Sequence, residues 1–218
     1  YLWSVVSSNK PLLLDTPFEK WDWDEVPRYR REQVRKWIFE KGLLDWDKMS
    51  NLPKSLKSEL SQRVDLLPME AVKVQGSSDT TKKILWKLRD QQLIESVLIR
   101  ATEGTKGVRA SRLTLCVSTQ VGCALGCKFC ASGLDGLKRN LSTGEIVGQI
   151  LLARGEAGRR IDNLVFMGMG EPLANLPALL PALNELSDGC SVETELKLVR
   201  SSGRIGLPTP HPLRSPHS

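Results

Sequence analysis

Long apolar runs are absent from this chain, and their absence argues against a helical membrane protein. No segment approaches the roughly 18 consecutive apolar residues that a spanning helix needs. The opening residues Tyr1-Leu-Trp-Ser-Val-Val-Ser-Ser lack a basic region followed by an apolar segment, so they do not predict a signal peptide. Position 1 is not methionine, which leaves open where the natural amino terminus lies.

Cysteine is scarce and odd in number, which argues against a disulfide framework. The chain has 5 cysteines among 218 residues, and most of them fall between positions 116 and 130. Such a cluster fits a metal site in a reducing compartment better than a set of disulfides. We therefore expect a cytoplasmic protein.

The last part of the chain lacks a recognisable pattern. Residues 207–218 contain four prolines and both histidines of the chain, and no aromatic residue follows Phe166. Beyond residue 187 the only candidate strand is Glu193–Val199. We expect residues 188–218 to form a divergent, disordered tail without a function.

Charge gives only a weak indication of partners. The 31 Lys and Arg residues exceed the 25 Asp and Glu residues by a net charge of +6. This excess mildly favours a polyanionic partner, although a solvated basic surface explains it equally well. The length and the 40% of hydrophobic residues are those of an ordinary soluble protein with a real core.

Three closely spaced thiols, Cys123, Cys127 and Cys130, are the most informative feature of the chain, and Cys116 lies upstream of them. A cubic iron–sulfur cluster held by three thiolates leaves one iron without a protein ligand, and a substrate can bind there. A closed zinc site would need all four thiols, including the distant Cys116. Buried structural cysteines are a further alternative.

Two blocks of sequence resemble the RlmN/Cfr family of radical S-adenosylmethionine (SAM) enzymes, which methylate adenosine in ribosomal RNA. They are Leu115-Cys-Val-Ser-Thr-Gln-Val-Gly-Cys-Ala-Leu-Gly-Cys-Lys-Phe-Cys130 and Phe166-Met-Gly-Met-Gly-Glu-Pro-Leu173. The resemblance runs from about Pro27 to about Leu186 and fails beyond Ser187. It implies methylation at C2 of adenosine in 23S rRNA and in tRNA, with the C8 position and a non-catalytic zinc-knuckle RNA-binding module as alternatives.

The resemblance also implies roles for individual residues. The cofactors would be a [4Fe-4S] cluster held by Cys123, Cys127 and Cys130, and SAM contacted by Gly170, Glu171 and Phe129. Glu95 would take the C2 proton and Cys116 would resolve the protein–RNA crosslink. The family's methyl-carrying cysteine has no counterpart here. The resemblance also implies an electron donor such as flavodoxin, and we expect the protein to be a monomer.

Two helices are predicted near the amino terminus. Residues 27–42 place Val34 and Ile38 at helical spacing, and residues 53–64 form the second helix. Arg28, Arg31 and Arg35 follow one another at steps of three and four, so we expect them on one side of the first helix, facing the phosphates of RNA. Simple solvation of these charges is the alternative.

A β-hairpin is predicted next, with strands over Ile84–Leu88 and Leu93–Ile99 and Asp90 in the turn. Glu95 has the same parity as the apolar residues of its strand. It is therefore either a charge on an edge strand or a carboxylate held in a pocket with a raised pKa.

The pattern beyond residue 112 predicts βα units with a parallel sheet. A strand over 113–117 precedes the cysteine loop, and a capping box at Ser142 and Glu145 opens a helix. A second strand over 163–167 ends at Gly168–Pro172, and this segment is either a ligand-binding loop or a plain turn. A helix over 176–186 follows.

The fold class we expect is α/β, with a helical accessory domain and a β-hairpin segment before the first βα units of a radical SAM partial barrel. The expected divisions are residues 1–68 for the helical RNA-binding domain, 69–108 for the hairpin segment, 109–187 for the partial core and 188–218 for the tail. The chain is expected to be a truncated form that does not methylate RNA.

Overall fold

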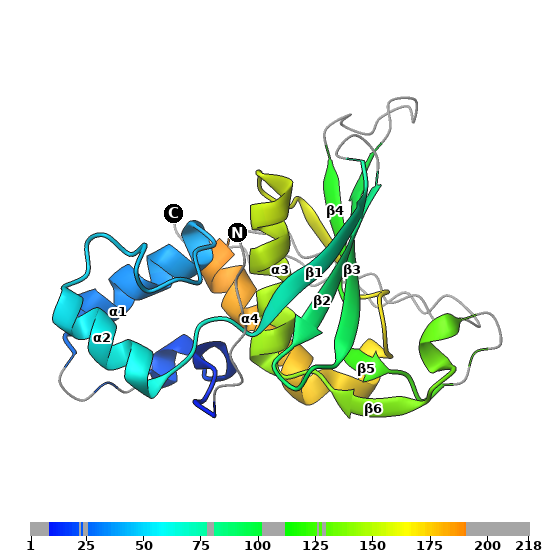
Figure 1. Cartoon of the computed structure of the whole chain (residues 1–218), viewed down its shortest axis with the longest axis horizontal. Coiled ribbons are helices and arrows are strands. Elements are labelled where there is room, and N and C mark those ends of the chain that lie inside the picture. The colour runs from blue at the N-terminus through cyan, green and yellow to red at the C-terminus, as the bar shows by residue number, and fades with distance from the viewer. Residues whose placement is uncertain are drawn as a thin grey trace, which may run out of the picture.

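The computed structural model describes residues 9–21, 23, 26–77, 81–101, 112–125, 127 and 130–190, with side chains through residue 187. A helical part lies beside a twisted sheet, and two further helices, α3 and α4, stand between them (Figure 1). The predicted tail begins at residue 188, but the helix Leu176–Cys190 continues through its first three residues; the rest of the tail, from residue 191, and Phe129 lie outside the described residues. No described helix is both long and apolar enough to cross a membrane.

The two predicted amino-terminal helices are confirmed. Helix α1, Arg28–Arg35, continues as a π-helical turn, Lys36–Glu40, and α2 spans Lys54–Arg63. A proline precedes each helix, where its fixed φ suits the first turn. No sequence pattern indicated the π-helical turn, which carries Ile38 and Phe39 into the core.

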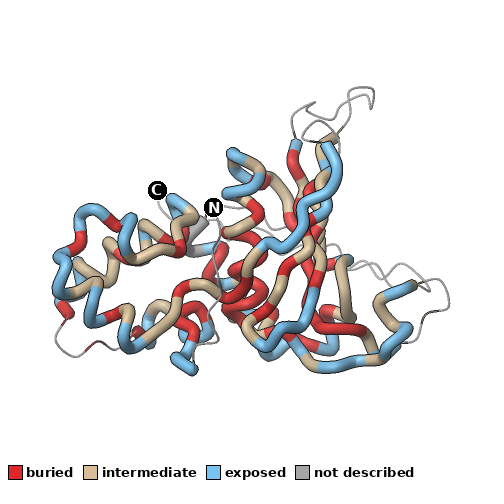
Figure 2. The backbone as a smooth tube through the Cα atoms, viewed as in Figure 1, coloured by how far each residue is buried: buried red, intermediate tan, exposed pale blue. Residues whose placement is uncertain are grey.

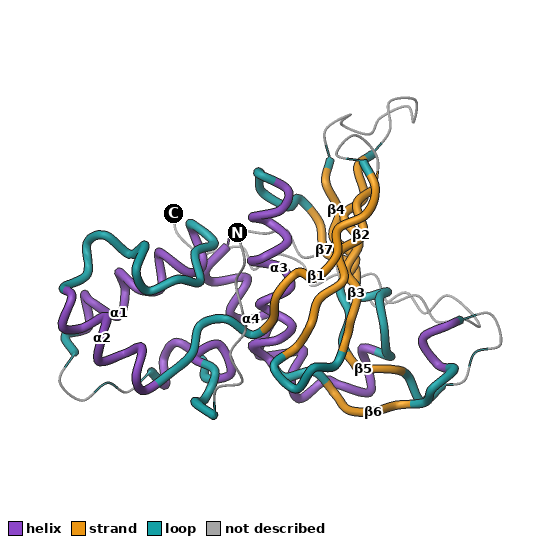
Figure 3. The backbone as a smooth tube through the Cα atoms, viewed as in Figure 1, coloured by secondary structure: helices purple, strands orange, loops and turns teal. Residues whose placement is uncertain are grey.

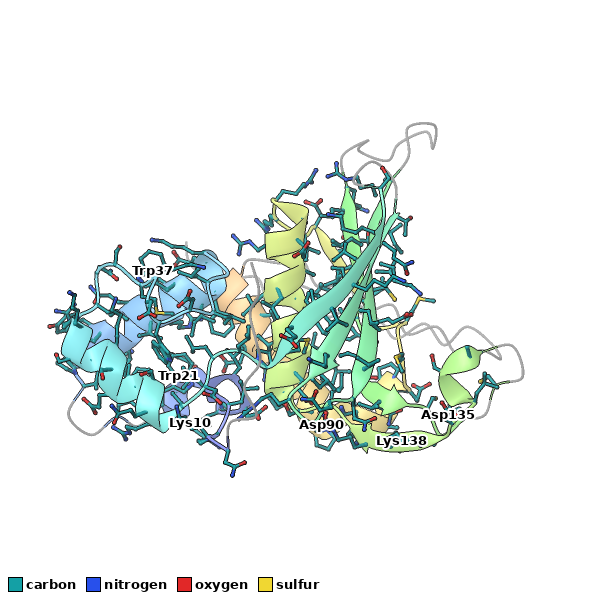
Figure 4. All side chains as sticks on the ribbon, viewed as in Figure 1. Lys10, Trp21, Trp37, Asp90, Asp135 and Lys138 are labelled. Carbon is teal, nitrogen blue, oxygen red and sulfur yellow. The ribbon has the colours of Figure 1, made fainter. Side chains whose placement is uncertain are left out.

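An apolar segment ahead of α1 joins the helical part to the rest of the molecule. The segment forms short 3-10 turns at Leu13–Asp15, which contacts α3, and at Phe18–Lys20, where Phe18 N–H donates to Glu185 of α4. Trp21 follows and is 2% exposed inside the helical part (Figure 4). The carboxylate of Asp15 accepts a hydrogen bond from the backbone N–H of Gly144 at 2.8 Å, in the first turn of α3. Sequence reasoning assigned no structure to this segment.

The main sheet has the order β1-β2-β3-β4-β7. Its strands are β1 Met69–Gly76, β2 Thr81–Leu88, β3 Leu93–Arg100, β4 Leu113–Cys116 and β7 Asn163–Val165. Strands β1 to β4 pair antiparallel, and β4 pairs parallel with β7. The hairpin and the parallel βα unit are therefore confirmed, whereas β1 was not predicted as a strand.

Helices cover one face of this sheet. Ile84, Trp86, Ile94 and Leu115 point to that face and are at most 1% exposed. Helix α3, Thr143–Ala157, contacts β1 and β3, and it also packs on α4, Leu176–Cys190. The predicted capping box opens α3: Ser142 and Glu145 exchange both hydrogen bonds. Buried residues concentrate along these helices and the strands beside them (Figure 2).

A two-stranded ribbon, which the sequence did not indicate, frames the cysteine loop. It pairs β5 Gln120–Gly122 with β6 Leu137–Asn140, and it extends below the main sheet (Figure 3). Arg139 of β6 donates to both oxygens of Glu145, at 2.7 and 2.8 Å, and to Asp90 at 2.6 Å. Burial alone would raise the pKa of Asp90, but its hydrogen bond with Arg139 holds that pKa below the usual value.

Candidate cofactor site beyond β4 and β7

The two motif loops leave the sheet at neighbouring positions. The cysteine loop follows β4 and β5, and the glycine loop Gly168–Gly170 follows β7, which pairs with β4. Loops that follow adjacent parallel strands meet at the same edge of the sheet, which is where open α/β sheets bind ligands. The fold therefore brings together two motifs that are separated by about 40 residues in the sequence.

Backbone hydrogen bonds hold the glycine loop against residues 117–120. Gly168 N–H donates to the carbonyl of Val117 at 3.1 Å, and Thr119 N–H donates to that of Met169 at 2.8 Å. A Cβ on Gly168 would lie 2.7 Å from Ser118 Oγ. Gly170 has φ +98°, and a Cβ there would lie 2.5 Å from Gln120 Cβ. Both glycines are required by this close approach.

Ser118 connects the glycine loop with strand β3. Its hydroxyl donates to the carbonyl oxygen of Glu95 at 2.6 Å and accepts from Met169 N–H at 2.9 Å. The carboxamide of Gln149, on α3, bonds both the N–H and the carbonyl of Ser118 at 3.0 Å. Ser96 extends this buried network by donating to Gln149 at 2.9 Å. The sequence carried no signal for these roles.

Glu171 begins the turn after the glycine loop. Its side chain accepts from Leu173 N–H at 3.2 Å and caps the 3-10 turn Pro172–Asn175. Its own N–H donates to Gln120 Oε1 at 2.9 Å. A carboxylate in this place can accept from an ammonium group. Beside it, the hydroxyl of Thr119 is buried and has no hydrogen-bond partner among the described residues.

Cys123, Cys127 and Cys130 are free thiols of intermediate exposure. Cys123 N–H donates to the carbonyl of Gly136 at 3.2 Å, and Cys130 N–H donates to that of Cys127 at 3.0 Å. Within the described ranges, no three Cys, His, Asp or Glu side chains are gathered as a metal-binding group. The donor set nevertheless fits an iron–sulfur cluster, because the loop supplies three free thiols and its two ends are fixed by the β5–β6 ribbon.

Cys116 lies apart from this loop, on the sheet face that the helices leave open. It is directly opposite Val97 of β3 and level with Val165 of β7. Burial raises the pKa of its thiol, and a hydrogen bond with the backbone at Met167 opposes the shift. The predicted separation of Cys116 from the three other thiols is consistent with a role outside the metal site.

Glu95 lies on the same open face as Cys116, because Val97 has the same parity as Glu95 and pairs with Cys116. Strand β3 is interior to the sheet, so the expectation of an edge-strand charge is wrong. The side chain is 41% exposed and pairs with Lys83 Nζ at 2.8 Å, so the described residues do not enclose it in a pocket. Glu95 is therefore a carboxylate on an open sheet face.

The predicted basic face of α1 needs a correction as well. Arg31 Nη1 donates to the carbonyl of Trp21 at 2.7 Å, and the guanidinium of Arg35 lies 5.1 Å from the ring centroid of Phe18. Both side chains are thus used inside the helical part. Arg28 and Tyr29 are exposed, Tyr29 by 57%. Helical spacing alone could not reveal that the segment before α1 covers one side of the helix.

A loop of three free cysteines and a neighbouring Gly-Glu loop, set at the edge of a parallel βα unit, define the radical SAM class. A solved radical SAM methyltransferase from Sphaerobacter thermophilus has the same fold, with a TM-score of 0.72 and 40% identity over 81% of this chain and 52% of that one. The family model for the ribosomal RNA large subunit methyltransferase N-terminal domain matches residues 22–66.

Similarity to curated proteins indicates the family within the radical SAM class. The chain is 51% identical over 166 residues to the "Probable dual-specificity RNA methyltransferase RlmN" of Akkermansia muciniphila, covering 76% of this chain and 46% of that protein. It is 40% identical to the RlmN of Nitratiruptor sp. over 202 residues, covering 88% and 57%. The chain belongs to the RlmN family. It spans about half the length of the curated relatives it matches.

Proposed function

We propose that this chain supplies the cofactor site of a radical SAM methyltransferase that modifies C2 of adenosine in 23S rRNA and in tRNA. The observation that carries the proposal is the joining of the two motif loops, in which residues 117–120 hydrogen-bond the glycine loop directly before the cysteine loop begins.

Cys123, Cys127 and Cys130 would hold the four-iron cluster, and Gly170 and Glu171 would bind the amino group of SAM. The glycine lets backbone approach the ligand, and the carboxylate accepts from the ammonium group. When bound, the cluster would supply the electron that cleaves SAM reductively, received from a donor such as flavodoxin. Phe129, in the same loop, would contact the adenine of SAM.

Glu95 and Cys116 would act on the RNA base. They share the open face of the sheet, on adjacent strands, and each is reached from the face opposite the helices. Glu95 would remove the proton from C2. Cys116 would then attack the sulfur of the crosslink, so that an S–S bond to the family's methyl-carrying cysteine forms as the S–CH2 bond to the base breaks; that cysteine has no counterpart in this chain. The Ser118 hydroxyl ties the backbone of Glu95 to the glycine loop, which supports a role for Glu95 near the SAM-binding loop.

The helical part, residues 1–68, would bind RNA phosphates, and residues 69–108 and 109–187 would form the hairpin segment and the partial core. Arg28 and Lys36 are exposed on α1 and its continuation, and Tyr29 offers a ring on which a base can stack. We further propose that the protein is a monomer and works in the cytoplasm.

Anaerobic reconstitution of the chain with iron and sulfide tests the proposal. We expect four irons for each chain, binding of SAM and, with reductant, release of 5′-deoxyadenosine. Stoichiometric zinc that depends on Cys116 would instead favour the non-catalytic knuckle. Mass spectrometry of RNA modified by a full-length relative would separate 2-methyladenosine from 8-methyladenosine, the product of the alternative C8 reaction.

A further inference from the structure

The side chain of Gln120 links Glu171, which follows the glycine loop, to the β5–β6 ribbon. Its Oε1 accepts from Glu171 N–H at 2.9 Å, and its Nε2 donates to Asn140 Oδ1 at 2.7 Å. The residue is 1% exposed. Because a backbone N–H can only donate, Oε1 must face Glu171, and this fixes the orientation of the amide.

The two partners of this amide belong to different segments of the chain. Asn140 ends β6, the strand that closes the cysteine loop, and Glu171 follows directly on the glycine loop. The stem of Gln120 also packs on Gly170, since a Cβ at Gly170 would lie 2.5 Å from Gln120 Cβ and 2.7 Å from its Cγ. A single side chain therefore connects the glycine loop with the ribbon from which the cysteine loop extends.

We infer that Gln120 is a positioning residue that sets the separation between the cluster loop and the SAM-binding loop. This inference rests on the proposed function. A buried amide that is satisfied at both ends resists displacement, because a shift of either loop leaves a buried polar group without its partner. Ligand-supporting contacts of this kind tune a site without touching the ligand.

The surroundings of Gln120 supply matched variants. Gln120→Met keeps the approximate shape but removes both hydrogen bonds. Asn140 is exposed, so Asn140→Leu removes only the bond to β6 at little risk to folding. Asn140→Asp keeps an acceptor for Nε2 in the same place, with its charge in solvent.

The test uses the whole chain, reconstituted with its cluster. Iron content is measured together with the affinity for SAM, by equilibrium dialysis, and the electron paramagnetic resonance spectrum of the reduced cluster with and without SAM. We expect wild-type iron in every variant. SAM affinity should fall about tenfold in Gln120→Met and about fivefold in Asn140→Leu, with a smaller SAM-dependent change in the spectrum. Asn140→Asp should match the wild type.

Two results would count against different claims. If Gln120→Met and Asn140→Leu bind iron and SAM as the wild type does, Gln120 is not a positioning residue and the inference is overturned. If the wild-type chain binds neither cluster nor SAM, the proposed function itself fails. Should Gln120→Met not fold, the Asn140→Leu and Asn140→Asp pair still decides, because both changes are at an exposed position.

Discussion

The hydroxyl of Ser118 donates to the carbonyl oxygen of Glu95 at 2.6 Å and accepts from the N–H of Met169 at 2.9 Å. These two hydrogen bonds tie the hairpin to the glycine loop. Ser118 is itself fully buried. Two segments of the chain, about 70 residues apart, are thereby held by one oxygen atom. The candidate base and the candidate SAM loop are mechanically coupled.

Replacing that hydroxyl should be costly. In Ser118→Ala, the N–H of Met169 loses its acceptor inside the protein, so we expect the free energy of unfolding to fall by about 1–3 kcal/mol. Urea denaturation followed by circular dichroism measures the change. Ser58→Ala, at an exposed position on α2, is the control and should stay within about 0.5 kcal/mol of the wild type. Equal stability of both variants would show that the coupling is weak.

The three loop cysteines should bind the cluster without help from Cys116. Each of Cys123→Ala, Cys127→Ala and Cys130→Ala is expected to lose the iron, whereas Cys116→Ala should keep it, because Cys116 lies on the open sheet face away from the loop. Iron and sulfide are assayed after anaerobic reconstitution. Iron loss in Cys116→Ala would place that thiol in the metal site.

Glu95 should affect chemistry and leave stability unchanged. Its ion pair with Lys83 is exposed on both sides, by 41% and 45%, and such pairs contribute at most about 1 kcal/mol. In a full-length relative with this strand, the Glu→Gln change should therefore spare folding and SAM cleavage while it blocks proton loss from C2. Normal formation of methylated adenosine would rule out Glu95 as the base.

The arginines of α1 should separate into two groups. Arg28→Glu is expected to weaken RNA binding and to lower the slope of log affinity against log salt by about 0.7–0.9, since it removes one phosphate contact. Arg31→Ala should instead destabilise the fold by about 1 kcal/mol, because Arg31 bonds the carbonyl of Trp21. An unchanged salt slope in Arg28→Glu would return this surface to ordinary solvation.

Cys116 should react slowly with alkylating agents below pH 9. Burial raises its thiol pKa, so the reactive thiolate is a smaller fraction at any given pH than for an exposed cysteine. Iodoacetamide labelling of the chain, resolved by peptide mass spectrometry, should show a rate at Cys116 that keeps rising above the usual thiol pKa of about 8.5. A plateau below that pH would mean that the thiolate is stabilised.

Elements with a strong period could be predicted from the sequence, and short or tertiary ones could not. The hairpin, α3 with its capping box and the βα unit followed from alternation, helical spacing and the Ser142–Glu145 pair. Strand β1 was missed because Val72 and Val74 lie on an exposed edge strand that lacks a buried alternating face. The β5 and β6 strands are too short for any period to show.

The candidate site divides in the same way. Cysteine spacing and the Gly-Glu motif are local, so they could be recognised from the sequence. Ser118, Gln120 and Gln149 act through partners 20 to 53 residues away, which no local pattern reveals. Similarly, Arg31 and Arg35 could be placed on one helix face, but the segment that covers that face could only be seen in three dimensions.

The parallel pairing of β4 with β7 also determines when the site can form during synthesis. Thr114 and Asn163 bond across this pair, and they are separated by 49 residues. At ordinary rates of translation this stretch takes about 2–10 s to emerge. Because β2 and β3 are neighbours in sequence, the hairpin can fold in microseconds, long before its parallel partner exists. The thiols of the cysteine loop therefore leave the ribosome before the glycine loop that would complete the site.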